Sequence, residues 1–246
     1  MKKEINLDLL KLESKGYISQ DGKRQGINEQ YREIKRSLLD MMVSSEKTKN
    51  MIMITSVRPE EGKTFNAINL ALSIAFEKDK TVLLVDLNMI HPGLNEALEF
   101  EAEKGMTEYL KGDFDDISEV IHQTNIGNLK VIPAGIPCNL ANELLASDRM
   151  RKLTEELSSR YPDRVIIFDS PSLYGVTETP IIANLMDQAL IVIEENVTNL
   201  SELKSSTSKF KDELAVGIVM NKSTKTRKTS FRANDYGTKI EEKEED

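Results

Sequence analysis

The stretch that decides the fold is TSVRPEEGKT, residues 55–64. It follows an apolar run at 51–55 and precedes residues 64–77, whose apolar side chains recur at helical spacing. A loop between a strand and a helix points backbone N–H groups and the positive end of the helix at an anion. The strict phosphate-loop pattern G-x-x-x-x-G-K-[ST] is not met, because Val57 stands at the first glycine position. The string alone therefore indicates phosphate binding with only moderate specificity.

The residue types in this loop have distinct chemical tasks. The Lys63 ammonium reaches the outer phosphates of a nucleotide, and the Thr64 hydroxyl is a ligand for Mg²⁺. The sequence thus predicts a site for ATP and Mg²⁺ at this loop. The residues that we expect at the nucleotide are Pro59, Glu60, Glu61, Gly62, Lys63, Thr64 and Phe65.

Short apolar runs alternate with helical stretches along the rest of the chain. Several runs, such as Val82–Val85, are apolar without interruption, which is expected where helices cover both faces of a strand. This alternation predicts an α/β fold: a doubly wound, mostly parallel sheet with helices on both faces. The expected strands are 51–55, 81–86, 129–133, 164–169, 189–194 and 216–220, and the expected helices include 64–77 and 148–161.

Two acidic residues end two of these strands. Asp86 follows the run 82–85, and Asp169 follows the run 165–168. In an open α/β sheet the ligand binds at the carboxyl ends of the strands, where both carboxylates would lie beside the loop and serve as ligands for Mg²⁺. Asn221, after the expected strand 216–220, is placed either to contact the nucleotide base or to cap a loop.

Composition excludes several classes of function. The 246 residues suit one α/β domain, and the net charge of −8 and the absence of Trp argue against nucleic-acid binding. The single cysteine, Cys138, rules out an intrachain disulfide framework, and a small loop residue is the favoured reading over a nucleophile. His91 and His122 show no zinc-ligand spacing and are not expected to be catalytic.

The ends of the chain differ from its centre. We expect a polar N-terminal segment and linker at 1–26, the nucleotide-binding domain at 27–221, and a flexible charged tail at 222–246. No apolar run approaches the roughly 20 residues that span a bilayer, and no signal-peptide core follows the start. We therefore expect a cytoplasmic protein that reaches the inner face of the membrane only through a partner.

At the three motifs the chain resembles the bacterial tyrosine kinases, the P-loop autokinases of exopolysaccharide and capsule synthesis, which share a broad class with septum-site and plasmid-partition ATPases. Residues 55–71 resemble the family's phosphate loop and first helix, 82–92 its second motif, and 164–171 its third. The segments 131–135, 143–147 and 161–164 are similar to the autokinases of exosortase and PEP-CTERM loci. The resemblance implies an ATP- and Mg²⁺-dependent protein-tyrosine autokinase, with Lys63, Asp86 and Asp169 catalytic.

The resemblance also implies partners. Glu29, Arg32 and Lys35 match the family's Glu-x-x-Arg-x-x-Arg helix, which implies ring-like self-association, although an ordinary solvated helix face is the alternative on spacing alone. A membrane co-polymerase that sets polysaccharide chain length is the implied activator. The family's C-terminal tyrosine cluster is reduced to Tyr236, the candidate phosphoacceptor.

Three departures leave other functions open. Asn88 and Ile90 replace an Asp and an Arg of the second motif, Glu60 replaces a glycine of the loop, and the tyrosine cluster is reduced to Tyr236. Asn88 cannot act as a base, so the catalytic role would fall on Asp86. The alternatives are a partition-type ATPase switch that phosphorylates no protein, and a degenerate nucleotide-binding subunit of a polysaccharide assembly complex.

Overall fold

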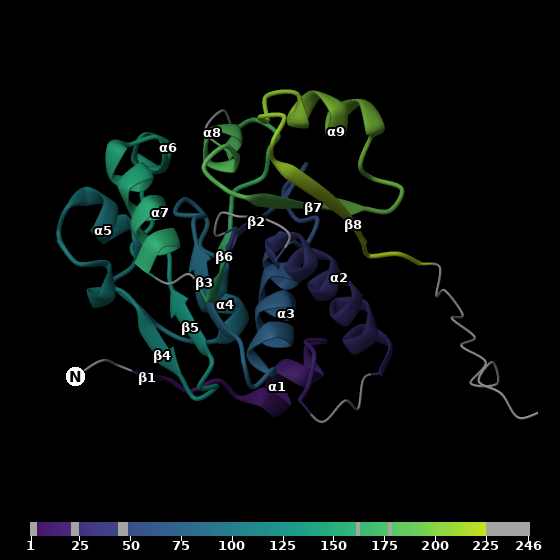
Figure 1. Cartoon of the computed structure of the whole chain (residues 1–246), viewed down its shortest axis with the longest axis horizontal. Coiled ribbons are helices and arrows are strands. Elements are labelled where there is room, and N and C mark those ends of the chain that lie inside the picture. The colour runs from purple at the N-terminus through teal and green to yellow at the C-terminus, as the bar shows by residue number, and fades with distance from the viewer. Residues whose placement is uncertain (1–3, 21–24, 44–48, 161–162, 177–178, 225–246) are drawn as a thin grey trace, which may run out of the picture.

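A computed structural model describes residues 4–20, 25–43, 49–160, 163–176 and 179–224, and Figure 1 shows their arrangement. An eight-stranded sheet in the order β1-β4-β5-β3-β6-β2-β7-β8 lies between two layers of helices. All neighbouring strands are parallel except the pair β4 and β5. The strands are β1 (Glu4–Ile5), β2 (Met51–Ser56), β3 (Thr81–Asp86), β4 (His122–Thr124), β5 (Leu129–Ile132), β6 (Arg164–Asp169), β7 (Gln188–Glu194) and β8 (Ala215–Asn221).

The helices cover the two faces of the sheet in two groups. Helices α1 to α4 pack on one face, in a cluster we call the α3-side core, and α5 to α8 pack on the other, in the α7-side core. Leu203 of α9 belongs to a small third cluster. The helices are α1 (Leu9–Ser14), α2 (Gln25–Val43), α3 (Lys63–Ala75), α4 (Leu94–Leu98), α5 (Met106–Lys111), α6 (Ala141–Leu145), α7 (Asp148–Arg160), α8 (Thr179–Ala183), α9 (Leu200–Thr207) and the 3-10 helix η1 (Ile117–Glu119).

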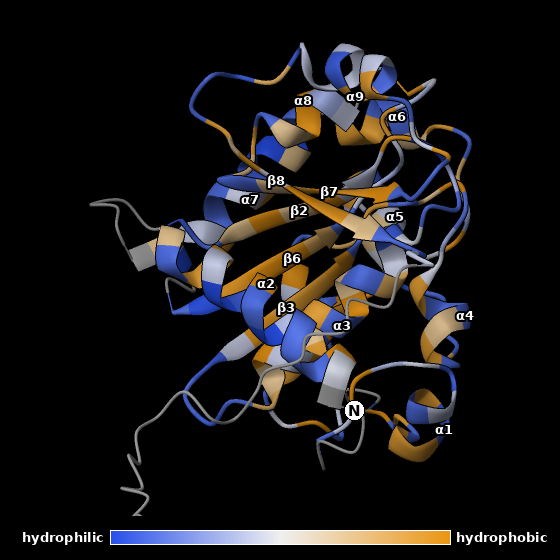
Figure 2. Cartoon of the chain, turned by 90° about the vertical axis from the view of Figure 1, so that its right-hand side faces the viewer, coloured by the Kyte–Doolittle hydropathy of each residue, from blue (hydrophilic) through white to orange (hydrophobic). Residues whose placement is uncertain are grey.

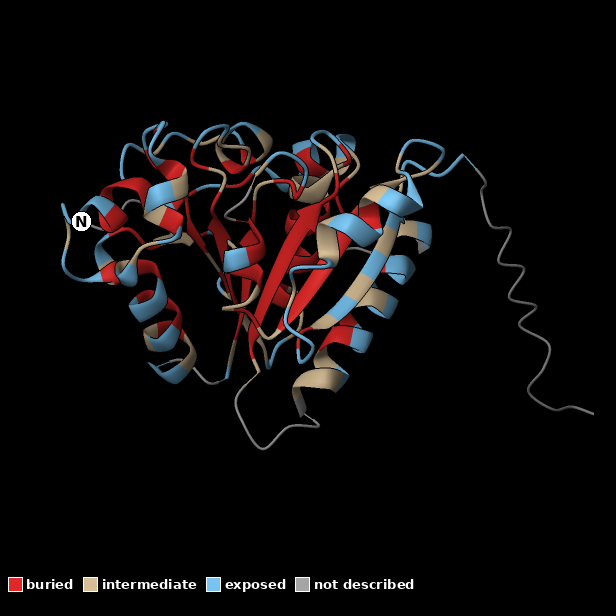
Figure 3. Cartoon of the chain, turned by 90° about the horizontal axis from the view of Figure 1, so that it is seen from above, coloured by how far each residue is buried: buried red, intermediate tan, exposed pale blue. Residues whose placement is uncertain are grey.

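The central strands are apolar on both sides because both faces are covered. In β2, Ile52 and Ile54 enter the α3-side core, whereas Met51 and Met53 enter the α7-side core. Figure 2 shows the strands as an apolar band, and Figure 3 shows the same band buried between helices that expose their outer faces. The uninterrupted apolar runs of the sequence are therefore explained by burial on two sides.

The predicted fold class is confirmed, and all six predicted strands are present as β2, β3, β5, β6, β7 and β8. Strands β1 and β4 are not among the predicted strands and contain only two and three residues. Neither strand is long enough for an alternation of apolar and polar residues to be recognised in the sequence.

The N-terminal segment is part of the folded domain. Predicted as a polar segment ahead of the domain, residues 4–20 instead add β1 to the sheet and α1 to the α3-side core. Ile5, Leu7 and Leu12 are buried there, as are Tyr17 and Ile18. The apolar cluster at the start of the chain thus serves the same core as α3.

The order of the strands creates a ligand-binding edge. The chain passes from β2 through α3 to β3, and β6 later inserts between these two strands. The carboxyl ends of β2, β6 and β3 therefore lie side by side, at the edge where open α/β sheets bind ligands. The phosphate loop follows β2 at this edge.

At the other edge of the sheet, no described strand pairs with the outer side of β8. β8 pairs with β7 along its whole length, and the side chains of Val216, Ile218 and Met220 are 44%, 54% and 56% exposed. An exposed apolar edge strand is uncommon in soluble domains. Separately, no described helix is long and apolar enough to cross a membrane.

We predict that replacing Leu12 by Ala lowers the free energy of unfolding by about 2–4 kcal/mol, because Leu12 is 4% exposed and its loss leaves a cavity in the α3-side core. Urea unfolding of the full chain measures this change. Leu10, on the same helix but 74% exposed, is the matched control, and Leu10→Ala should change stability by less than about 0.5 kcal/mol. Equal effects of the two substitutions would contradict the packing described.

Candidate active site

The phosphate loop turns sharply into α3. Gly62 precedes the helix with a φ of +96°, where a side chain is strained, and a Cβ there would lie 2.1 Å from Nδ2 of Asn221 and displace it. Glu60 also has a left-handed backbone, with a φ of +66°, at the position where the resemblance expects glycine. Its side chain is exposed. The departure is therefore tolerated sterically, at the strain usual for a non-glycine residue in this region.

Glu61 shapes the loop from inside. Only 1% of this residue is exposed, its Oε2 accepts the backbone N–H of Arg58 at 2.8 Å, and its Oε1 accepts the hydroxyl of Thr198. The Arg58 guanidinium extends outward and binds both carboxylate oxygens of Glu202, at 2.9 and 2.5 Å. Glu61 is thus occupied within the chain, and the loop is fixed to the segment that follows β7.

Asn221 contacts the loop. Its Nδ2 donates to the backbone carbonyl of Glu61 at 2.8 Å, from the end of β8. The structure therefore gives Asn221 the loop-capping contact, one of the two roles that the sequence left open. Contact with a nucleotide base stays a prediction.

The register of two central strands pairs the acidic residues. Asp86 at the end of β3 stands directly opposite Asp169 at the end of β6, and both residues are fully buried. The backbone N–H of Leu87 also donates to the carbonyl of Asp169 at 2.8 Å. The two carboxylates are thereby held together at the ligand-binding edge.

The carboxylate of Asp86 is held by backbone groups. Its Oδ1 accepts the N–H of Asn88 at 2.9 Å, and its Oδ2 accepts the N–H groups of Gly93 and Leu94, each at 3.1 Å. A Cβ on Gly93 would lie 3.0 Å from the Thr64 hydroxyl, so the segment after β3 passes close to the loop. Asp86 therefore ties the segment 88–94 to the site and keeps one acceptor position on Oδ1.

Asp169 connects directly to the loop. Thr64 donates its hydroxyl to Oδ2 of Asp169 at 2.6 Å, while the buried Oδ1 of Asp169 has no hydrogen-bond partner among the described residues. An unpaired buried carboxylate oxygen beside a hydroxyl and a second carboxylate suits a hard cation such as Mg²⁺. The described residues hold no cluster of three or more His, Cys, Asp or Glu side chains that could hold a metal ion.

Burial governs the charge state of this pair. Loss of solvation, followed by repulsion from Asp169, raises the pKa of Asp86, although its three backbone N–H bonds oppose the rise. Burial also raises the pKa of Asp169, against the attraction of Lys63 and the bond from Thr64. The pair therefore holds a proton at a pH where ordinary carboxyl groups have lost theirs.

Other residues predicted in the loop lie around these groups. Lys63 and Thr64 begin α3 and are half-buried, and Pro59 is exposed. The ring of Phe65 packs on Tyr17 with centroids 5.1 Å apart. Phe65 therefore contacts the N-terminal segment, and its contact with a nucleotide stays a prediction.

The three residues of the expected self-association motif do not share one exposed surface. Glu29 and Arg32 are exposed on α2 and pair with each other. Lys35 is 8% exposed, and its ammonium binds the carboxylate of Glu77 and the carbonyl of Ser73. Lys35 is therefore directed at α3, not at a neighbouring molecule. Tyr236, the predicted phosphoacceptor, lies outside the described residues.

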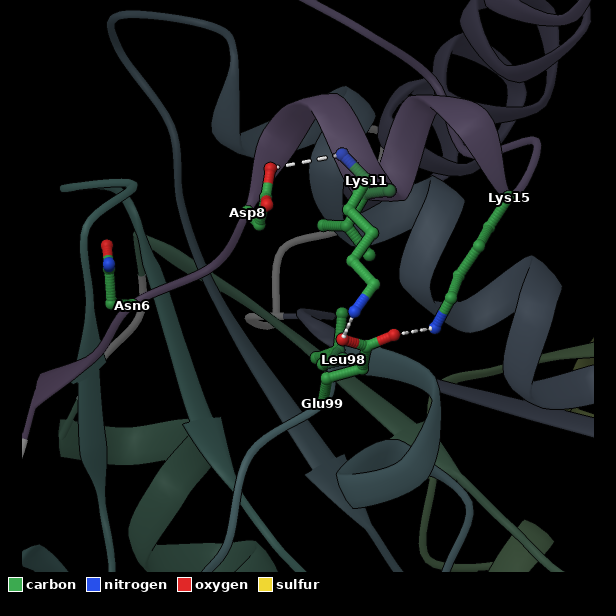
Figure 4. Close-up of a pocket in the computed structure, with 7 residues that line it drawn as sticks. Asn6, Asp8, Lys11, Lys15, Leu98 and Glu99 are labelled. Atoms are coloured by element: carbon green, nitrogen blue, oxygen red, sulfur yellow. Dashed lines mark hydrogen bonds and ion pairs between the residues drawn. The ribbon is translucent and has the colours of Figure 1, made fainter.

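A small cavity lies away from the loop, between α1 and α4. Its volume is about 60 Å³, which holds a few water molecules but no nucleotide. Figure 4 shows Lys11 and Lys15 of the N-terminal segment converging on the carboxylate of Glu99 there. These ion pairs are exposed and contribute little stability. The full lining is Asn6, Asp8, Lys11, Leu12, Lys15, Leu98 and Glu99.

Comparison with known sequences agrees with this geometry. Residues 49–216 match the family described as an AAA domain. The chain is 32% identical over 219 residues to the tyrosine-protein kinase YwqD of Bacillus subtilis, which covers 86% of this chain and 87% of that protein. Two further relatives named tyrosine-protein kinases, from Acinetobacter johnsonii and Salmonella typhimurium, are longer, and the chain spans 28% of the length of each.

Solved structures show the same fold. The kinase domain of Escherichia coli tyrosine kinase ETK superposes with a TM-score of 0.68 at 25% identity, over 92% of this chain and 85% of that chain. The septum site-determining protein MinD of Pyrococcus horikoshii, solved with Mg-ADP, gives a TM-score of 0.58 at 22% identity, over 70% and 69% of the two chains. The similarity to MinD shows only that the two proteins share a fold.

We predict that the metal-free protein loses stability as the pH rises. Both native pKa values lie above those of the unfolded chain, so the folded state binds more protons, and this advantage disappears as the pH rises from near 4 through the native values. Asp169→Asn removes one of the two like charges and should reduce the loss between about pH 5 and about pH 8 by on the order of 1–3 kcal/mol. Urea unfolding at a series of pH values, with a chelator present, measures the free energy of unfolding of both proteins.

The exposed carboxylate of Asp79, which lies outside the site, supplies the control. Asp79→Asn should leave the pH dependence unchanged. Parallel stability profiles of wild type and Asp169→Asn would show that the buried pair does not carry the effect.

Proposed function

We propose that this chain, which belongs to the AAA-domain family and to the bacterial tyrosine-protein kinases, transfers the γ-phosphoryl group of ATP to tyrosine hydroxyls with the help of Mg²⁺. The observation that supports this most is the constellation at the end of the loop. Thr64 is bonded to Asp169, and Asp86 stands in register beside it. This is the arrangement of hydroxyl and carboxylates that a nucleotide-bound cation requires.

Phosphoryl transfer asks little covalent chemistry of a protein. Charge on the phosphates must be neutralised, and the acceptor must be held in line with the bond that breaks. Lys63 and the backbone N–H groups that begin α3 supply positive charge at the loop. These groups bind the β- and γ-phosphates in the proposed complex.

The metal site is formed by groups already in contact. Thr64 and Asp169 share a hydrogen bond, and the unpaired Oδ1 of Asp169 offers a further acceptor. Bound Mg²⁺ supplies charge neutralisation at the phosphates. Thr64 and Asp169 would hold the ion, with Asp86, which stands in register with Asp169, as a second carboxylate.

Asp86 is the group that would receive the proton of the acceptor. The tyrosine oxygen attacks the γ-phosphorus, the bond to the bridging oxygen breaks, ADP leaves, and the phenolic proton passes to Asp86. Asp86 keeps one acceptor position on Oδ1, which is the capacity that a proton acceptor needs. Asn88 donates its backbone N–H to Asp86, so its contribution here is to orient the carboxylate.

Exposure argues against three of the four described tyrosines as acceptors. Among the tyrosines of the described residues, Tyr17, Tyr31 and Tyr109 are buried, whereas Tyr174 is 61% exposed beside the loop. Tyr236 lies in the C-terminal stretch beyond them. We propose Tyr236 as the phosphoacceptor, with Tyr174 as its competitor.

We further propose that the chain self-associates and acts at the membrane through a partner. Glu29 and Arg32 present paired charges on the outer face of α2, which suits contact with another copy. A membrane polysaccharide co-polymerase is the proposed activator, and control of exopolysaccharide synthesis or export is the proposed outcome. The kinship with autokinases of exosortase loci stays a prediction.

A second candidate is an ATPase switch of the partition type. Asn88 in place of an acidic residue favours it, and the likeness to MinD in fold is consistent with it. Arg58 of the loop is bound to Glu202 within the chain, so it is not free to reach a nucleotide in a second copy. Phosphate release without phosphotyrosine would select the switch, and nucleotide binding without turnover would select a degenerate subunit.

We predict that Lys63→Ala lowers phosphotyrosine formation by on the order of 100-fold or more, because it removes a cation from the transferring phosphates. The assay incubates the full chain with Mg²⁺ and γ-labelled ATP, with and without the cytoplasmic segment of the co-polymerase. Mass spectrometry then locates the modified tyrosine. Lys78→Ala, an exposed lysine beyond α3, is the matched control and should retain activity.

Two tyrosine variants identify the acceptor in the same assay. Tyr236→Phe should remove most of the label, and Tyr174→Phe should leave most of it. The reverse pattern would move the acceptor to Tyr174. Wild-type protein that forms no phosphotyrosine even with the co-polymerase segment would end the kinase proposal.

A further inference from the structure

Two asparagine amides hold consecutive carbonyls of the phosphate loop. Asn221 donates to the carbonyl of Glu61 at 2.8 Å, and Asn66 donates its Nδ2 to the carbonyl of Gly62 at 2.9 Å. The backbone N–H of Asn66 reaches the same Gly62 oxygen at 3.0 Å. The two peptide groups at the tip of the loop are therefore fixed by side chains from β8 and α3.

Fixing these carbonyls also fixes two N–H groups. In a trans peptide the carbonyl and the N–H of the next residue point in opposite directions within one plane. The described chain has no cis peptide bond. Holding the oxygens of Glu61 and Gly62 therefore directs the N–H groups of Gly62 and Lys63 away from the two asparagines. These N–H groups belong to the set that binds phosphate in the proposed function.

The orientation of the Asn66 amide is itself set by a tyrosine. Tyr31 of α2 donates its hydroxyl to Oδ1 of Asn66 at 2.8 Å. Burial raises the pKa of Tyr31, so the hydroxyl keeps its proton and remains a donor. Because Oδ1 is taken by Tyr31, the Nδ2 of Asn66 faces Gly62. Tyr31 and Asn66 are 5% and 2% exposed, so water does not compete for these bonds.

Tyr31 lies on a helix that is held firmly against α3. Further along α2, the ammonium of Lys35 binds Ser73 and Glu77 at the far end of α3. Leu38 is buried in the same α3-side core. The hydroxyl of Tyr31 therefore has a defined position relative to the start of α3.

We infer that Tyr31 is a positioning residue for the phosphate loop, which acts through Asn66 to set the peptide group between Gly62 and Lys63. This inference rests on the proposed binding of a nucleotide at the loop. Tyr31 touches no phosphate itself. Its hydroxyl selects one orientation of the Asn66 amide, and that amide holds the carbonyl that orients the N–H of Lys63.

A double-mutant cycle on the full chain tests this relay. Isothermal titration with Mg-ADP gives the dissociation constant for wild type, Tyr31→Phe, Asn66→Ala and the double variant. Tyr31→Phe keeps the ring and its packing, and should weaken binding about threefold to tenfold, the range of one hydrogen bond. In the Asn66→Ala background the same change should have no further effect, because the relay is already broken.

Two further variants separate positioning from packing. Tyr109→Phe removes a hydroxyl from a buried tyrosine of the α7-side core and should bind Mg-ADP as wild type does. Asn66→Asp keeps an acceptor for Tyr31 but replaces the donor toward Gly62 with a carboxylate. It should weaken binding at least as much as Tyr31→Phe, and it serves in place of Asn66→Ala if that variant does not fold.

The outcomes are distinct. Unchanged affinity of Tyr31→Phe, or effects that add fully in the double variant, would overturn the relay while leaving nucleotide binding intact. Wild-type protein that does not bind Mg-ADP would overturn the proposed function itself. Thermal unfolding of each variant shows that the folded state was the one titrated.

Discussion

The pairing of β3 with β6 brings two acidic side chains together in the interior of the protein. Hydrogen bonds from the surrounding residues compensate for their charges. Asp86 and Asp169 are fully buried and in register. Burial of like charges is unfavourable unless each is bonded. Three backbone N–H groups bind Asp86, and the Thr64 hydroxyl binds Asp169. The course of segment 88–94, the start of α3 and the position of the phosphate loop all follow from this requirement.

The shape of the loop depends on groups that the reaction does not consume. Glu61 binds the backbone at Arg58 and the hydroxyl of Thr198, and Asn66 and Asn221 each hold a loop carbonyl. Because these contacts already hold the backbone of the loop in position, its N–H donors would not have to reorganise to bind a phosphate. The carboxylates of the pair differ from these groups, because one of them keeps an unpaired oxygen. The loop is thus preorganised, whereas the acidic pair keeps an oxygen that no described residue bonds.

The sequence predicts the strands and the chemistry of the loop, because both depend on local patterns. Uninterrupted apolar runs identify the central strands, and each strand-end Asp lies where its run ends. The sequence does not predict that Glu61 is an internal brace or that Lys35 faces α3, because both roles depend on contacts with distant residues, Thr198 and Glu77. β1 could not be predicted for the same reason, because Glu4 and Ile5 form a strand only by pairing with the distant strand β4. Asn66 could have been singled out as an amide in the first turn of the loop's helix.

The position of β8 at the edge of the sheet affects how firmly the phosphate loop is held. Outer strands are the first elements of a sheet to open, since only one neighbour holds them. β8 ends in Asn221, so transient fraying of this strand would release the carbonyl of Glu61. Backbone amides of β8 should therefore exchange with heavy water faster than those of β2 in the empty protein. A phosphate bound as proposed would hold the loop from its other side, so the same amides should become more protected and β8 would report whether the site is filled.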